Sequence, residues 1–202
     1  MAIATVDAVP AAPPAAAPAR PRVLFIGTAL ATAATVMAFA GLIGIYLSAR
    51  AATLATGDPW LPEGAVIPLT PPNMALLTLV LSAITMQWAV DAVGKHDRPH
   101  AYLALGITLL FGAAYLNAMS FLFTQMGMSI RDSETAVLIY VITGAHMAMV
   151  AATMIFAVVM GFRTLGGEQS GRNREGIAAA ALYWHASIAV FSVIWLAIYV
   201  MK

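Results

Sequence analysis

The chain has 202 residues, of which 61% are hydrophobic and only 9% charged, and its formal net charge is +1. Soluble domains carry about 25% charged residues, and part of any small globule must face water, so a soluble domain could not hide this much apolar surface. The composition therefore predicts an integral membrane protein. The small net charge gives no indication of nucleic acid as a partner. The absence of cysteine excludes disulfides, thiolate metal sites and iron–sulfur clusters.

Residues 1–21 differ from the rest of the chain in composition. They are rich in Ala, Pro and Val, and five of them are proline. Proline at this density blocks a regular helix, and alanine provides too little buried surface for the segment to fold alone. We therefore expect a disordered tail over residues 1–21, followed by a single membrane domain over residues 22–202.

Five uncharged stretches in this domain are long enough to cross a bilayer, which requires about 20 mostly apolar residues. Pro71, Pro72 and Pro99 stand just before the second and third stretches, where proline fits the first helical turn. The sequence therefore predicts an all-α bundle of five transmembrane helices. The expected spans are residues 23–49, 73–90, 101–123, 135–162 and 177–201. Between the first two spans, the loop 50–72 is predicted to form a compact cap with Trp60 at the membrane interface.

The distribution of basic residues predicts the orientation. Five spans place the N-terminus, the second loop and the fourth loop on one side of the membrane. That side carries seven of the ten Lys and Arg residues, and the other side carries three. Because cytoplasmic loops are enriched in Lys and Arg, we expect the N-terminus in the cytoplasm and the C-terminus outside.

The acidic and basic residues all lie in the tail, in loops or at the edges of the spans. Pumps, carriers and voltage sensors need ionisable groups at membrane depth, where such groups are costly unless they serve a function. The empty spans therefore argue against a small transporter formed by this chain alone.

His146 and His185 are the two histidines within the spans. A haem held by two histidines needs both imidazoles at one depth on facing helices. Counted from the cytoplasmic ends of their spans, they lie roughly 25 Å and roughly 13 Å deep at about 1.5 Å per residue. Because of this offset, we predict that each neutral imidazole hydrogen-bonds a neighbouring helix instead of binding haem.

Small residues recur at a spacing of four on two of the spans, which predicts close packing between helices. These rows are Ala40, Gly44 and Ser48 on the first span, and Gly144, Ala148 and Ala152 on the fourth. Tyr183, Trp184 and His185 are consecutive in the fifth span, and three consecutive residues cannot share one helix face. Part of this cluster must therefore face a partner, a lipid headgroup or a neighbouring helix.

A series of short motifs follows the spans in chain order. They are Ala40-Gly41-Leu42 with Tyr46 and Ala49-Arg50, then Trp60 with Pro62, the stretch 81–85 (LSAIT), Thr108 with Gly112, Thr143-Gly144-Ala145-His146, and Tyr183-Trp184-His185 with Tyr199. In this order they resemble subunit III of the haem-copper oxidases (cytochrome c oxidase subunit 3), in the five-helix form that lacks the first two helices of the seven-span version. The resemblance covers residues 22–202.

The chain departs from this family at the positions where the family has intramembrane carboxylates, a glutamine and a second histidine. Here those positions are occupied by Thr35, Met119, Leu122, Met149 and Ile188. The chain is thus a divergent member that keeps the packing residues and has lost the titratable ones. Family roles that depend on those acids, such as support of proton uptake, are therefore in doubt for this chain.

The resemblance implies a non-catalytic accessory subunit of a terminal oxidase in aerobic electron transport, in the cell membrane of a bacterium. It implies no haem or copper in this chain, haem and copper in subunit I, contacts with subunits I and II, and a bound phospholipid. Candidates for structural, lipid or partner contacts are Arg50, Trp60, His146, Tyr183, Trp184 and His185. Two alternatives stay open: a paralogue that serves another complex such as a nitric oxide reductase, and a haem-binding membrane anchor.

Overall fold

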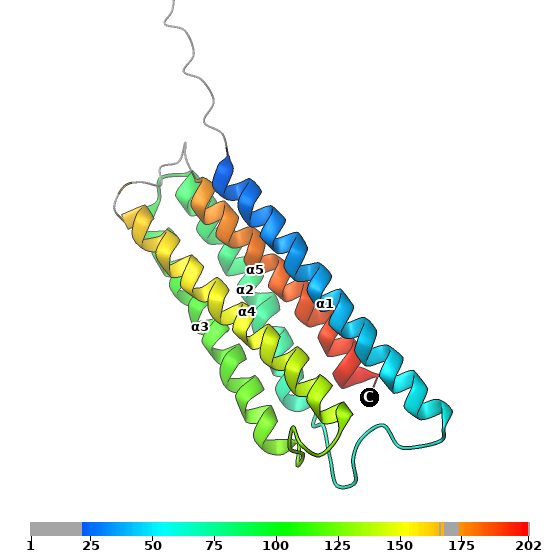
Figure 1. Ribbon diagram of the computed structural model, residues 1–202. Helices are drawn as coiled ribbons and strands as arrows, with labels where there is room; N and C mark the ends of the chain where they lie inside the picture. The colour runs from blue at the N-terminus through cyan, green and yellow to red at the C-terminus, as the bar shows by residue number, and fades with distance from the viewer. Residues whose placement is uncertain (1–21, 166, 168–173, 202) are drawn as a thin grey trace, which may run out of the picture.

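The structure is a computed structural model that describes residues 22–165, 167 and 174–201. The expected disordered tail at residues 1–21 lies outside the described residues. Five helices are long and apolar enough to cross a membrane, which confirms the predicted all-α class and the number of spans (Figure 1). They are α1 (Val23–Ala55), α2 (Thr70–Gly94), α3 (Arg98–Gln125), α4 (Glu134–Leu165) and α5 (Glu175–Ile194), which continues as the π-helix η1 (Trp195–Val200).

The first four helices extend beyond their predicted spans, because polar and charged residues at the membrane edges continue the helical backbone. The last helix begins two residues earlier than predicted and, continued by η1, ends at Val200, one residue before the predicted limit. The largest difference is at the end of α1, which runs past Arg50 to Ala55. Arg50 is therefore a helical residue, and the first loop covers residues 56–69 instead of 50–72. The prolines before α2 and α3 lie in the first turns of these helices, as predicted.

The last helix, α5, is the centre of the bundle. It contacts α1, α2 and α4, while α3 packs against α2 and α4. In Figure 1, α1 runs along one edge of the bundle beside α5. Within the most apolar window of each span, 50% of the residues of α5 are buried inside the protein, against 11% for α1. Most of the surface of α1 therefore faces lipid or another protein.

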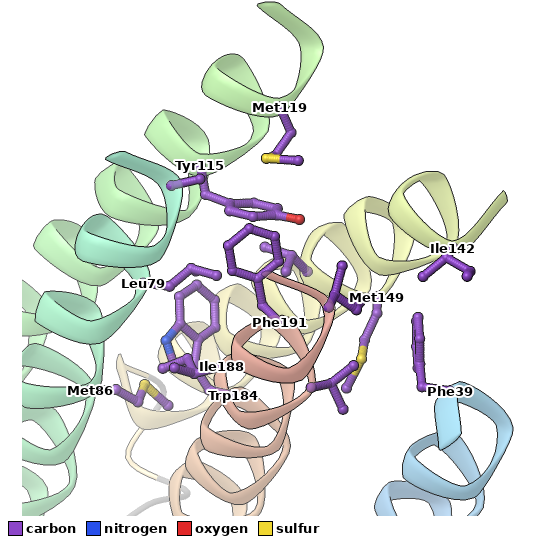
Figure 2. Close-up of a cluster of buried hydrophobic side chains, with 14 of the residues drawn as sticks. Phe39, Leu79, Met86, Tyr115, Met119, Ile142, Met149, Trp184, Ile188 and Phe191 are labelled. Atoms are coloured by element: carbon purple, nitrogen blue, oxygen red, sulfur yellow. The ribbon is translucent and has the colours of Figure 1, made fainter. Parts of the chain in front are cut away.

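The core is formed by large side chains from all five helices. Figure 2 shows the Trp184 indole lying between Leu79 and Met86 of α2 and Ile188 of its own helix. Trp184 is fully buried, and Gly112 of α3 lies close to the edge of its ring. A Cβ at Gly112 would come within 2.9 Å of the Trp184 ring, so only glycine permits this approach of α3.

The small-residue rows do not pack inside the chain, so that prediction is wrong. Ala40, Gly44 and Ser48 are exposed on α1, and Ala148 and Ala152 are exposed on α4. A Cβ built on Gly44 or Gly144 has no atom of another described helix within 4 Å. The faces of α1 that meet α4 and α5 instead carry larger residues. These are Phe39, Ile43 and Tyr46.

The connections at the two ends are held by short-range bonds. At the end opposite the N-terminus, the first loop meets the end of α3 through the Val66 N–H, which donates to the Met126 carbonyl at 3.1 Å. At the other end, Asp97 caps α3 by accepting a hydrogen bond from the His100 backbone N–H at 3.3 Å. The hydrogen bond from the His100 ring lowers the pKa of Asp97.

The close approach at Gly112 gives a test of the core. We expect Gly112→Ala to destabilise the purified chain by about 1–3 kcal/mol, because the new methyl group meets the Met154 sulfur and the Trp184 ring at 2.9 Å each. Gly106→Ala, on the same helix with nothing within 4 Å, should be neutral or stabilising by up to about 1 kcal/mol. Thermal unfolding in detergent measures both variants. Equal melting temperatures for the two would contradict this packing.

Candidate functional site

Trp60 joins the first loop to two helices. Its indole N–H donates to the Tyr46 hydroxyl of α1 at 3.0 Å, and its carbonyl accepts from the Thr135 hydroxyl at the start of α4 at 2.9 Å. The Tyr46 and Trp60 rings also meet edge to face at 5.3 Å. Trp60 is only 7% exposed, so its ring packs inside the protein at this end of the bundle, and its predicted depth at the membrane interface stays a prediction. The ring is drawn inward because Tyr46 offers an acceptor that a buried indole needs.

Arg50 ties α1 to the end of the chain. A guanidinium nitrogen of Arg50 donates to the Met201 carbonyl at 2.6 Å, directly after the π-helix η1. In η1 the Tyr199 hydroxyl is paired with the Thr143 hydroxyl of α4 at 2.8 Å. The C-terminal segment is thereby fixed to both α1 and α4.

His146 lies at the centre of the bundle and uses both ring nitrogens. Nε2 is 2.8 Å from the Ser187 carbonyl of α5, and Nδ1 is 2.7 Å from the Tyr115 hydroxyl of α3. A carbonyl can only accept, so Nε2 carries the proton and Nδ1 accepts from Tyr115. The imidazole is fully buried and joins three helices, as predicted for a structural histidine. Neither nitrogen has a lone pair left for an iron atom.

The predicted depth offset between His146 and His185 is wrong. His146 bonds to the carbonyl of Ser187, which is only two residues from His185 and therefore roughly 3 Å away along the axis. The prediction failed because α4 extends further than α5 at the end of the bundle where α4 ends and α5 begins, so counting residues from that end exaggerates the offset. His185 itself bonds within its own helix, through Nδ1 to the Ala181 carbonyl at 2.6 Å, instead of to a neighbouring helix.

The other two members of the consecutive cluster point to different helices. The Trp184 N–H donates to the Ser82 hydroxyl of α2 at 2.8 Å. The Tyr183 hydroxyl lies 3.3 Å from the Thr35 hydroxyl of α1. Trp184 is buried, whereas Tyr183 and His185 are half-buried. The cluster thus divides between two neighbouring helices, and His185 retains part of its surface for lipid or a partner.

Most polar motif residues of the sequence are therefore paired with one another or with a neighbouring helix. A further pair joins the hydroxyls of Thr85 and Thr108, between α2 and α3, at 2.7 Å. The sequence analysis named most of these residues but did not predict which of them pair. It did not name Tyr115, whose hydroxyl donates to His146 Nδ1. A tyrosine in an apolar span was the only available signal, because such a hydroxyl needs a partner.

Glu175 is another residue that sequence reasoning missed. It is the first residue of α5, and its carboxylate accepts a hydrogen bond from the Phe25 N–H in the first turn of α1 at 2.9 Å. The free N–H groups and the dipole at the start of a helix favour a negative charge. One carboxylate thus interacts with the N-termini of two helices and fixes the N-terminal end of α1.

Five positions were compared in the sequence analysis with carboxylates, a glutamine and a second histidine of the resembling family. Met119, Leu122, Met149 and Ile188 are all buried in the core. Thr35 is half-buried beside Tyr183. Among residues 22–165, 167 and 174–201, no group of three or more His, Cys, Asp or Glu side chains is arranged to hold a metal ion.

These contacts define a multi-pass membrane bundle whose buried polar side chains join its own helices. The family model described as Cytochrome c oxidase subunit III matches residues 17–202. The chain belongs to this family.

The known relatives carry the same name at low identity. Cytochrome c oxidase subunit 3 of Bos taurus is 30% identical over 187 residues, which covers 91% of this chain and 70% of the relative. The protein of Pelomedusa subrufa is 28% identical over 177 residues, covering 86% and 67%. That of Strongylocentrotus purpuratus is 29% identical over 164 residues, covering 80% and 63%. The low identity agrees with a divergent member.

The Trp184–Ser82 bond can be tested by a double-mutant cycle. Ser82→Ala leaves the buried indole N–H without an acceptor and should cost about 1–3 kcal/mol of stability. After Trp184→Phe, the same Ser82→Ala change should cost clearly less, because the donor is already gone. Thermal unfolding of the purified chain measures all four proteins. Trp88→Phe, at a ring that is 38% exposed, is the control and should have little effect. Strictly additive costs would show that the bond does not contribute.

The double role of Glu175 can be tested by Glu175→Gln. The change keeps an acceptor oxygen but removes the charge at the starts of α1 and α5, an interaction of about 0.3–1 kcal/mol at each helix. We expect hydrogen exchange at the Phe25 amide to become about two- to fivefold faster. Glu63→Gln in the exposed first loop is the matched control. Unchanged exchange at Phe25 would remove the proposed link between the two helices.

Proposed function

We propose that this chain is the accessory subunit III of a haem-copper terminal oxidase in an aerobic electron transport chain. The match to the subunit III family over residues 17–202 is the observation that carries this proposal. In it, the haem and copper centres belong to the partner subunit I. This chain contributes no redox centre of its own and stabilises the partner, in contact with subunits I and II.

The interior of the chain supports a structural role. His146, Trp184 and Trp60 use their polar atoms on other parts of the same chain, so they hold the bundle together. Two of the family's intramembrane acid positions are filled here by the core residues Leu122 and Ile188, of which Leu122 is fully buried. A packed apolar core offers no path for protons. Proton uptake is therefore not part of the proposal.

The oxidase is favoured over the two alternatives. The relatives from Bos taurus and Pelomedusa subrufa are named for cytochrome c oxidase, which supports an oxidase in preference to a nitric oxide reductase. A haem anchor would need a free ring nitrogen on His146, and both of its nitrogens have protein partners.

Further parts of the proposal concern the surface of the chain. Arg50, Tyr183 and His185 are half-buried and are the candidates that can contact a partner or a phospholipid. Basic residues at the end of the bundle that holds Arg22, Lys95 and Arg163 support a cytoplasmic N-terminus. The proposed location is the cytoplasmic membrane of a bacterium, with the C-terminus outside.

Copurification tests the proposal. The tagged chain is isolated from its native membranes in a mild detergent, and copurified proteins are identified by mass spectrometry. We expect subunits I and II of a haem-copper oxidase, together with haem absorbance and copper. The same chain purified after expression without these partners should show no haem absorbance. A haem spectrum from that isolated chain would contradict the cofactor-free role, and copurification of a different enzyme would contradict the oxidase.

The stabilising role predicts a further outcome for membranes that lack this chain. Oxygen consumption should start at a similar rate but decay faster during turnover, because a structural subunit supports the partner without supplying catalytic groups. Restoring the chain should restore the lifetime. A loss of the initial rate with no change in lifetime would contradict a purely structural role.

A further inference from the structure

One carboxamide in the described part of the chain has no hydrogen-bond partner. Asn73 accepts from the Trp195 indole, Gln87 donates to Asp91, and Gln125 donates to Thr124. The fourth carboxamide, Asn117 on α3, is exposed and has no hydrogen bond to any described residue.

Asn117 lies at hydrocarbon depth. The helix α3 has 28 residues and is therefore roughly 42 Å long, whereas the hydrocarbon core is about 30 Å thick. With the excess shared between both ends, roughly 6 Å of α3 extends beyond the core on each side. Asn117 lies roughly 12 Å from the end of α3 at Gln125, and so about 6 Å inside the core.

Lipid cannot satisfy this carboxamide. Acyl chains offer neither donors nor acceptors, and an unsatisfied polar group in hydrocarbon costs several kcal/mol. The neighbouring polar groups of this chain follow that rule, because the hydroxyls of Thr143 and Tyr199 in the same half of the bundle are paired. The Asn117 carboxamide stays unsatisfied only as long as no other protein packs against the outer side of α3.

The surface around Asn117 suits another helix. Three of its neighbours on the outward side of α3 are small, with Ala113, Ala114 and Ser120 all exposed. Two bulky exposed residues, Leu110 and Phe121, border this small-residue surface. Small residues let two backbones approach, and an asparagine between them can then bond across the interface. The outward side of α2 is different, since it carries the bulky Leu77 and Ile84, 52% and 67% exposed, as expected for a surface that meets lipid.

We infer that the face of α3 formed by Ala113, Ala114, Asn117 and Ser120 docks a transmembrane helix of the partner subunit, which offers a hydrogen-bonding group to the Asn117 carboxamide. This inference rests on the proposed function, because it requires that the chain assembles with a larger membrane protein. The partner helix presents a hydroxyl, carboxamide or carbonyl group about 6 Å inside the hydrocarbon core.

The first test separates docking from folding. Asn117→Leu replaces the exposed carboxamide by a side chain that lipid solvates well, so the isolated chain should melt at the same temperature or higher. Retention of the partner during purification should fall about three- to tenfold, as expected for the loss of one interhelical hydrogen bond. Gln87→Leu, at an exposed carboxamide of α2, is the matched control and should leave retention unchanged. Unchanged retention of the partner by the Asn117→Leu chain would overturn the inference.

The second test identifies the occupant. The chain has no cysteine, so Asn117→Cys creates a single thiol for a photoreactive crosslinker. We expect an adduct with a transmembrane segment of the copurified partner, and none from the matched variant Ile84→Cys on α2. An adduct with a second copy of this chain alone, or no adduct in a complex that still copurifies, would overturn the docking face and leave the proposed function standing. If the unmodified chain copurifies with no oxidase, the proposed function is contradicted, and the docking inference that rests on it is contradicted as well.

Discussion

No water is present inside a bilayer to satisfy a polar group, so every hydroxyl, indole N–H or imidazole nitrogen in a span needs a partner from the protein. This constraint organises the bundle. Tyr46 meets Trp60, Ser82 meets Trp184, and His146 joins three helices. Interhelical bonds of this kind are worth about 0.6 kcal/mol on average, so no single one holds the bundle. Their main effect is on register, because a helix that slid by one turn would break its bonds and leave buried groups unsatisfied.

The position of α5 follows from the same constraint. It pairs with α2 through Trp184, with α4 through the Ser187 carbonyl, and with α1 through Tyr183. The helix α1 has little buried surface of its own and is fixed to the last segment at both ends, by Glu175 and by Arg50. The first and last spans are therefore held to each other at both ends. The outer surface of α1 is rich in alanine and glycine and is left free of contacts within the described chain.

The number of spans and their approximate limits could be predicted because crossing the membrane requires length and apolarity, both of which are visible in one sequence. Which side of each helix faces its neighbours could not be predicted, because the spans are apolar on all sides. A row such as Ala40 and Gly44 can face another helix or lipid equally well. The pairing of motif residues was also hidden, because it depends on the relative heights of helices such as α4 and α5. The π-helix at Trp195–Val200 had no signal either, since its sequence contains neither proline nor glycine.

The replaced acid positions show how the constraint acts on a scaffold. A carboxyl group at a buried position needs a donor beside it, and Leu122 and Ile188 lie in the hydrophobic core. Once a carboxylate is lost from such a position, its former donors also become unsatisfied, so apolar residues at the whole site are the stable outcome. Thr35 is different, because it still has the Tyr183 hydroxyl at 3.3 Å. The contact between α1 and α5 thus contains a polar pair, whereas the interior positions are apolar. These positions can therefore serve in packing without any role in moving protons.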